Sequence, residues 1–167
     1  NMYFLHKSKA FNTENSKLIN QQIKNFNEII FVTSVFNLKE FNKLLRFSKK
    51  LDSKIKILIL GPIPNVNTFD PLKCLIRNKE CYIDSEVDIN TRNLSLLIDK
   101  INKFSKEDEK FKLFLPYFYL CNNTNSKRCI IYDNVRDVLT HRDGSHLTYE
   151  GSLLLLKPFN DFIKKNY

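Results

Sequence analysis

An aspartate and a histidine three positions apart are the residues best suited to do chemistry in this 167-residue chain. Asp143 and His146 fall in a stretch that we expect to be a loop just before the last helix. A turn at this spacing lets the carboxylate accept a hydrogen bond from one imidazole nitrogen, which leaves the other free to take a proton from a hydroxyl nucleophile. The pair therefore predicts a general base and its orienting partner.

The spacing by itself is a weak pattern, because Asp-x-x-His arises by chance in many proteins. The alternative, favoured on spacing alone, is a turn whose aspartate accepts backbone amides and whose histidine is merely exposed. Two neighbours strengthen the local reading: Thr148 is placed to cap the last helix, and Gly151 lets another backbone segment approach its first turn. Arg142 could contact an anionic or carbohydrate substrate, although a solvated arginine is the simpler expectation.

A longer string around the pair resembles a known family. Residues 143–152 read Asp-x-x-His-Leu-Thr-x-x-Gly-Ser, which is similar to the last sequence block of SGNH hydrolases. The chain resembles most the SGNH domains fused behind membrane O-acyltransferases of the acyltransferase 3 type, which modify bacterial surface polysaccharides. Looser matches are the cysteine pair before this block, the Gly-Pro-x-Pro segment at residues 61–64, and Arg92 with Asn93. The resemblance covers about residues 28–162.

This resemblance implies a flavodoxin-like three-layer α/β/α sandwich with a parallel sheet and a Ser-His-Asp mechanism. In that mechanism His146 is the general base, Asp143 orients it, and no metal or organic cofactor is needed. The serine should lie in a Gly-Asp-Ser block after the first strand, yet none of the three glycines precedes Asp-Ser. We therefore expect a single domain over residues 1–167 that is N-terminally incomplete, with a gap in its sheet and poor stability. A degenerate domain that has lost catalysis is the alternative.

The oxyanion-hole donors of the family normally come from a Gly-x-Asn-Asp block, and here Thr-Ser-Val-Phe-Asn stands in its place at residues 33–37. Ser34 or Asn37 could point a donor at an oxyanion. The competing and favoured interpretation is an ordinary strand end and helix cap. Ser145 is too close to His146 along the chain to be its nucleophile.

The elements that must position these residues alternate between strands and helices. Short apolar runs at residues 28–33, 56–60 and 112–115 predict strands buried on both faces, and residues 1–5 are a candidate strand remnant. Apolar residues at helical spacing predict helices over residues 16–26, 38–51, 91–104 and about 149–164. Pro158 should kink or break the last one. A loop of about 25 residues should follow Gly61. The alternation predicts an α/β fold with a parallel sheet.

Four cysteines form two local pairs, Cys74 with Cys81 and Cys121 with Cys129. Neither spacing is typical of a zinc site. Of the three possible disulfide connectivities, the two short-loop bridges are the simplest, and they would indicate an oxidising compartment. Four separate buried thiols remain the alternative.

Other side chains carry plainer expectations. We expect His6 and His141 to be surface histidines rather than metal ligands, and Asp133 and Asp137 to cap a turn. The three aromatic residues 117–119 should line the core or a cleft rather than form a sugar-stacking platform.

The net charge of +9 comes from scattered lysines in a chain rich in Lys, Asn and Ile, so we do not expect a nucleic-acid partner. No run of eighteen apolar residues is present, and membrane attachment is expected only through an upstream domain.

The leading hypothesis is O-acyl transfer, with acetyl favoured, to a bacterial cell-surface glycan. The partners would be that glycan acceptor and an acyl donor delivered by a membrane acyltransferase domain. The chain would work in the periplasm or at the extracellular face of the inner membrane, tethered by upstream transmembrane segments. An SGNH esterase that hydrolyses acyl esters is the runner-up. A non-catalytic glycan-binding or scaffold domain is the alternative from another class, and a basic nucleic-acid-binding module comes third.

Overall fold

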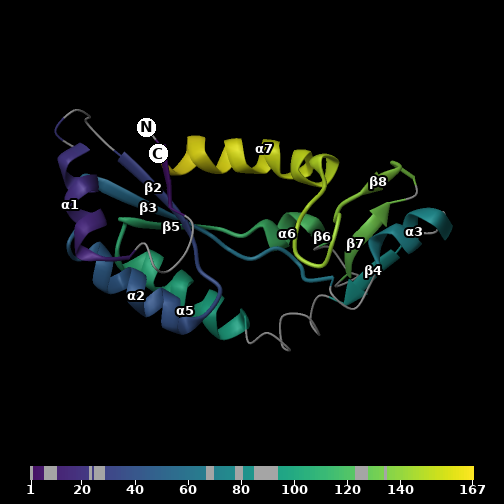
Figure 1. Cartoon of the computed structure of the whole chain (residues 1–167), viewed down its shortest axis with the longest axis horizontal. Coiled ribbons are helices and arrows are strands. Elements are labelled where there is room, and N and C mark those ends of the chain that lie inside the picture. The colour runs from purple at the N-terminus through teal and green to yellow at the C-terminus, as the bar shows by residue number, and fades with distance from the viewer. Residues whose placement is uncertain are drawn as a thin grey trace. The chain divides into compact units, whose positions relative to one another are not determined.

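The computed structural model describes residues 2–5, 11–22, 24, 29–66, 70–77, 81–84, 94–122, 128–133 and 135–167 (Figure 1). The chain divides into two compact units, and each is described by itself. Unit 1 comprises Asn1–Pro62 and Asn93–Phe114, and unit 2 comprises Ile63–Arg92 and Leu115–Tyr167. The single domain expected over residues 1–167 stays a prediction.

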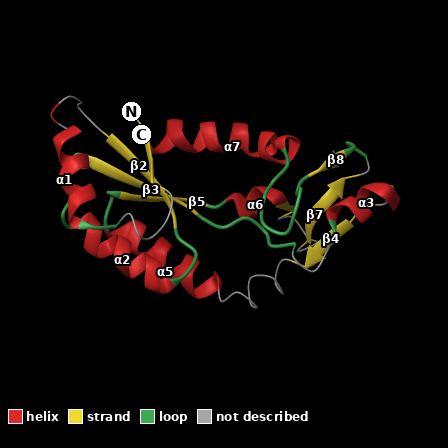
Figure 2. Ribbon diagram, in the orientation of Figure 1, coloured by secondary structure: helices red, strands yellow, loops and turns green. Residues whose placement is uncertain are grey.

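Unit 1 contains a four-stranded sheet in which every neighbouring pair is parallel (Figure 2). Its strands, in spatial order, are β1 (Met2–Leu5), β2 (Ile29–Ser34), β3 (Ile55–Leu60) and β5 (Phe111–Phe114). The predicted α/β class with a parallel sheet is therefore confirmed, and the structure is consistent with a flavodoxin-like fold.

The central strands are buried on both faces, which explains why their sequences are apolar without alternation. Phe31 of β2 lies opposite Ile57 of β3 on one face, and Val32 lies opposite Leu58 on the other. All four side chains are at most 1% exposed. Runs of this kind are typical of parallel strands covered on both sides.

Three helices of unit 1 follow the predicted stripes: α1 (Thr13–Gln22), α2 (Leu38–Ser48) and α5 (Leu94–Glu107). The ends of two predicted helices, at residues 23, 25–26 and 91–93, lie outside the described residues.

Helices α2 and α5 cover the same face of the sheet, because their aromatic side chains meet strand residues there. Phe47 of α2 packs on Phe31 with ring centroids 5.7 Å apart. Phe104 of α5 packs edge-on against Phe111 of β5 at 5.1 Å and against Phe41 of α2 at 6.0 Å. These contacts join both helices to the sheet in one hydrophobic core.

The expected gap in the sheet is not present among the described residues. Residues Met2–Leu5 pair with β2 over four positions, and β3 pairs directly with β5. Unpaired backbone N–H and C=O groups inside a sheet are costly, so a strand that can pair with the β2 edge is stabilised by doing so. The expectation of a gap was therefore wrong.

Unit 2 is built from short elements around an antiparallel sheet. In chain order they are α3 (Pro71–Arg77), β4 (Cys81–Asp84), α6 (Pro116–Leu120), β6 (Cys121–Asn122), β7 (Arg128–Asp133), β8 (Val138–Leu139) and α7 (Tyr149–Asn166). Strand β7 is central and pairs with β4, β6 and β8.

The long loop expected after Gly61 contains two regular elements, so that prediction was wrong in part. Helix α3 and strand β4 lie within it, and β4 pairs with β7. The partner strand is more than forty residues further along the chain, which is why local sequence patterns did not indicate a strand here.

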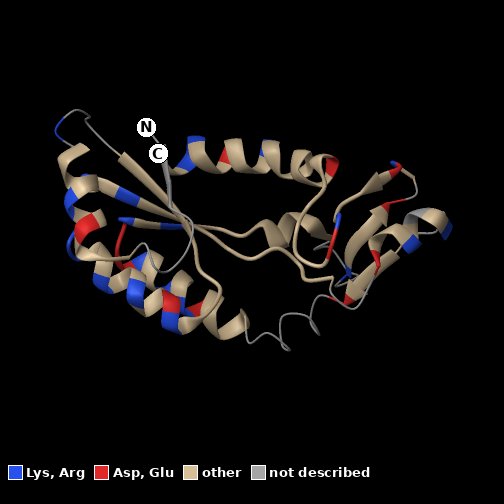
Figure 3. Cartoon of the chain, viewed as in Figure 1, with Lys and Arg blue, Asp and Glu red and all other residues tan. Residues whose placement is uncertain are grey.

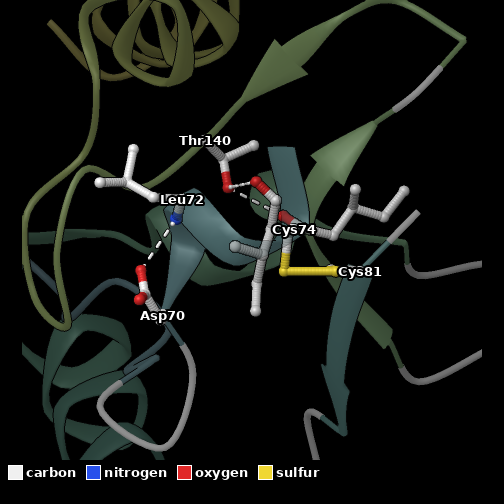
Figure 4. The surroundings of a disulfide bond; sticks show 7 residues. Asp70, Leu72, Cys74, Cys81 and Thr140 are labelled. Carbon is white, nitrogen blue, oxygen red and sulfur yellow. Dashed lines mark hydrogen bonds between the residues drawn. A yellow bond between two sulfur atoms is a disulfide. The ribbon is translucent and has the colours of Figure 1, made fainter. Parts of the chain in front are cut away.

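Both expected disulfides are present, Cys74–Cys81 and Cys121–Cys129. The first joins α3 to β4, and nearby the Asp70 carboxylate accepts the amide of Leu72 at 3.1 Å (Figure 4). The second joins directly opposed residues of β6 and β7. A small apolar cluster surrounds the second bridge: Val66, Ile83, Tyr117, Cys121, Cys129 and Ile131.

Helix α7 continues through Pro158, so of the predicted kink or break the break does not occur, while the kink stays a prediction. Proline cannot donate to the carbonyl four residues earlier, but the rest of the helical ladder is maintained on either side. Within the described part of the chain, no helix is both long and apolar enough to cross a bilayer. Lysines and arginines outnumber acidic residues on α2 and α5 and are spread along both helices, in keeping with the scattered charge of the sequence (Figure 3).

Candidate active site

The Asp143 carboxylate and the His146 ring lie against each other in the loop between β8 and α7. Nδ1 of His146 is 2.9 Å from Oδ1 and 2.9 Å from Oδ2 of Asp143. With Nδ1 donating to the carboxylate, Nε2 is the nitrogen that can accept a proton. The side chain of His146 is 61% exposed and that of Asp143 is 48% exposed. The pair therefore has the geometry of an oriented base at an accessible position.

Backbone amides fix the carboxylate from the other side. Oδ1 of Asp143 accepts the amides of Ser145 and His146, each at 2.9 Å. The Ser145 amide is the largest cause that lowers the pKa of Asp143 to about 2; the hydrogen bonds from His146 lower it further, and burial opposes them. The turn that we weighed as an alternative is thus present, and the same carboxylate also holds the imidazole. Asp143 is ionised at neutral pH.

The two ends of this loop are joined across its base. His141 and Leu147 form an isolated antiparallel bridge, and the Arg142 amide donates to the His146 carbonyl at 3.0 Å. Both interactions limit the movement of the backbone that carries the imidazole, because they join the segments before and after the loop at and next to His146.

The start of α7 anchors the far end of the loop. Thr148 is the N-cap, and its hydroxyl oxygen accepts the Gly151 amide at 2.9 Å, as predicted. The same hydroxyl donates to the Leu139 carbonyl, and the Thr148 amide donates to the Thr140 carbonyl at 3.0 Å. A Cβ at Gly151 would lie 2.8–2.9 Å from backbone atoms of Thr140. The predicted close approach at Gly151 is therefore confirmed.

His141 is buried, so the prediction of a surface histidine was wrong. It is 1% exposed, with Nδ1 2.8 Å from the Thr140 hydroxyl and Nε2 3.1 Å from the Pro64 carbonyl. A second bond joins the same segments, because the Val66 amide donates to the Gly144 carbonyl at 3.0 Å. The ring thus links the start of the Asp143–His146 loop to the last residue of the Gly-Pro-x-Pro segment.

Sequence reasoning missed this contribution of His141. The apolar Val138 and Leu139 just before it were the available signal. The acceptor carbonyl is 77 positions away, so no local pattern could reveal the contact.

The neighbours of the pair behave as expected. Ser145 Oγ is 3.4 Å from Nδ1 of His146, which is the nitrogen already bonded to Asp143 and not the one that would act as the base. Nε of Arg142 lies 3.6 Å from Oδ2 of Asp143, and its side chain is largely exposed.

Ser34 and Asn37 belong to unit 1, at the end of β2 and the start of α2. Oδ1 of Asn37 accepts the Glu40 amide at 2.9 Å, and the Glu40 carboxylate accepts the Phe36 amide at 2.9 Å. This arrangement is similar to a capping box, except that the Glu40 carboxylate bonds the residue before the N-cap instead of the N-cap itself. The cap interpretation thus accounts for Asn37, while the oxyanion role of Ser34 and Asn37 stays a prediction.

The remaining polar candidates form a turn. Oδ1 of Asp133 accepts the amides of Val135 and Arg136, and Oδ1 of Asp137 accepts the Tyr132 hydroxyl at 2.9 Å. Asp133 therefore caps the turn as predicted.

Of the three aromatic residues of α6, Tyr117 is buried in the core, whereas Phe118 and Tyr119 line a cavity.

No cluster of three or more potential metal ligands occurs among the residues whose structure is described. His6, Arg92 and Asn93 lie outside those residues.

The family model of the SGNH domain found fused to AT3 domains matches residues 5–161 of this chain. Comparisons with curated proteins and with solved structures found no match. The match includes the Asp143–His146 loop and both disulfides, and at the family level it supports acyl transfer or ester hydrolysis. Because it spans nearly the whole sequence, this chain belongs to the family of SGNH domains fused to AT3 domains.

Proposed function

We propose that this domain transfers an O-acyl group, with acetyl favoured, to a hydroxyl of a bacterial cell-surface glycan. The observation that carries the proposal is the 2.9 Å contact of His146 Nδ1 with both carboxylate oxygens of Asp143, in a loop tied at both ends. A base oriented in this way is what activation of a hydroxyl requires.

In the proposed reaction the nucleophilic serine lies outside these 167 residues, which contain no Gly-Asp-Ser string. Nε2 of His146 removes the serine proton while the serine oxygen attacks the acyl carbonyl. The protonated imidazole then gives that proton to the leaving group, and an acyl-serine remains. Nε2 next takes the proton of a glycan hydroxyl, whose oxygen attacks the acyl-serine; collapse returns the proton to the serine and releases the acylated glycan.

Asp143 assists each step without exchanging a proton. Its carboxylate holds Nδ1–H and so keeps Nε2 available as the base. Its negative charge also stabilises the imidazolium that forms during the reaction, and a pKa of about 2 keeps that charge in place throughout the neutral range.

The proposed location is the extracytoplasmic side of the bacterial inner membrane, where the fused AT3 domain would deliver the acyl donor. The family's fusion to AT3 domains supports this placement. The two disulfides support it too, because such bonds persist in oxidising compartments.

The test uses the full-length protein with His146→Ala and Asp143→Asn, and measures acyl groups on the surface polysaccharide. We expect His146→Ala to lower transfer by roughly a thousandfold or more, and Asp143→Asn by at least about a hundredfold. Ser145→Ala is the matched control in the same loop and should transfer normally, because its hydroxyl faces the wrong imidazole nitrogen. Normal transfer by His146→Ala would refute the proposal.

Two further functions have specific support. An esterase would use the same pair with water as the acceptor, and product analysis with and without glycan separates it from a transferase. A non-catalytic glycan-binding domain is favoured by the missing Gly-Asp-Ser string. In that case the native chain and His146→Ala would both show no acyl transfer, and both would bind the glycan.

A further inference from the structure

Two neighbouring cavities on unit 2 share one aromatic side chain, Tyr119 of α6. The first has a volume of about 400 Å³ and is bounded by α6, β7, the turn that follows β7, β8 and Leu154 of α7. The second has a volume of about 490 Å³ and lies along α7, from Lys157 to Asn166. Each volume falls in the range of small-ligand pockets, about 300–1,000 Å³.

The aromatic residues of the first cavity are unusually accessible. Phe118 is 46% exposed and Tyr119 is 49% exposed, whereas Tyr117 beside them is buried. Flat aromatic faces at the edge of a cavity can pack against the C–H face of a sugar ring, and a tyrosine hydroxyl can also bond to its hydroxyl groups.

A fixed carboxylate and a guanidinium line the same cavity. Asp133 Oδ1 accepts the amides of Val135 at 3.0 Å and Arg136 at 3.1 Å, and Oδ2 lies 3.5 Å from Nε of Arg136. The backbone bonds hold the carboxylate in position before any ligand arrives. Carboxylate oxygens and guanidinium N–H groups side by side offer the acceptors and donors that adjacent sugar hydroxyls require.

The second cavity, which Tyr119 also lines, contains the same kinds of side chain. Lys157 Nζ lies 2.5 Å from Oδ2 of Asp161, and Lys165 and Asn166 line the cavity as well. Phe162 adds an apolar wall. Aromatic or apolar surface with polar groups around it therefore occurs in both of the cavities that share this tyrosine.

We infer that the two cavities form one groove that binds a glycan chain, with successive sugar units on either side of Tyr119. The inference rests on the proposed function in taking the acceptor glycan as the occupant. Thr140 lines the first cavity, and its carbonyl accepts the amide of Thr148 at the end of the Asp143–His146 loop. The groove thus adjoins the residues that hold that loop.

The experiment measures glycan binding by the full chain without any acyl donor. An array of bacterial capsular polysaccharides and lipopolysaccharide O-chains identifies a binder, and calorimetry compares its tetrasaccharide with its monosaccharide. We expect the tetrasaccharide to bind at least about tenfold more tightly, and Tyr119→Ala to weaken it by roughly tenfold or more, as truncation of an aromatic anchor does. Tyr119→Phe should bind within about threefold of the native chain, because the ring is retained.

Tyr149→Ala is the matched control, since Tyr149 is an exposed tyrosine of the same unit outside both cavities. The assignment is overturned if no polysaccharide on the array binds, if Tyr119→Ala binds as the native chain does, or if Tyr149→Ala is equally impaired. His146→Ala should retain binding. If His146→Ala abolishes transfer but glycan binding does not depend on Tyr119, the groove is refuted and the proposed function stands. If glycan binding depends on Tyr119 but the native chain never transfers an acyl group, the proposed function is refuted and the groove stands.

Discussion

Replacement of Gly151 by alanine tests the close contact between helix α7 and the Thr140 backbone, at the base of the Asp143–His146 loop. The added Cβ would lie 2.8 Å from the carbonyl carbon and 2.9 Å from the Cα of Thr140, and closer still to the carbonyl oxygen. Ordinary carbon–carbon contacts lie at about 3.5–4.0 Å. Helix α7 and the Thr140 backbone must therefore separate by roughly 0.7 Å, because neither contact involves a flexible side chain.

The free-energy change combines three effects. Overpacking costs about 1–3 kcal/mol. Separation also weakens the bond from the Thr148 amide to the Thr140 carbonyl and the one from its hydroxyl to Leu139, worth about 1 kcal/mol each. Alanine recovers about 1 kcal/mol of helix propensity over glycine. We expect a net loss of about 2–4 kcal/mol in the free energy of unfolding.

Equilibrium unfolding in urea, followed by far-ultraviolet circular dichroism, measures this loss directly. Glu150→Ala is the control at the neighbouring exposed position, and it should change the free energy by only about 0.5 kcal/mol. A Gly151→Ala chain as stable as the native chain, or more stable, would refute the close approach of α7 to Thr140.

Three other predictions concern different parts of the chain. Lys110→Met removes three hydrogen bonds from Nζ to the carbonyls of Ser48, Leu51 and Asp52 at 3.1–3.2 Å. Burial of the ammonium group, which lowers the pKa of Lys110, offsets part of what these bonds contribute, so the free energy of unfolding in urea should fall by about 1–3 kcal/mol. The exposed control Lys103→Met should change it little. Replacing Cys121 and Cys129 together by serine opens a short loop and should lower stability by about 2–3 kcal/mol, so equal unfolding midpoints with and without the bridge would contradict it. The pKa of Asp143, followed by carboxyl carbon NMR, should be about 2 in the native chain and should stay below 3.8 in His146→Ala, because the Ser145 amide is the largest cause of the lowered pKa. The contribution of the Asp143 carboxylate to stability is present above pH 3.8 and is lost as the pH falls toward 2. A normal pKa in the native chain would contradict the turn geometry.

Local physics explains what could be predicted from the sequence. Strands β2, β3 and β5 follow from short apolar runs, and the helices of unit 1 follow from apolar residues at helical spacing. The Asp143–His146 contact, the Thr148 cap and the capping at Asn37 join residues only three positions apart. At such separations the turn geometry itself brings the groups together.

The tertiary structure decided everything that depends on partners distant in sequence. His141 is buried because Pro64, 77 positions away, accepts its Nε2 bond, and β4 is a strand because β7 pairs with it. Tyr119 lines both cavities because helix α6 packs beside helix α7, whose cavity-lining residues are more than thirty positions away along the chain. Residue type and spacing thus determined which groups could do chemistry, whereas long-range packing decided which groups hold them in place, since burial and hydrogen-bond partners across the fold are not local properties of the chain.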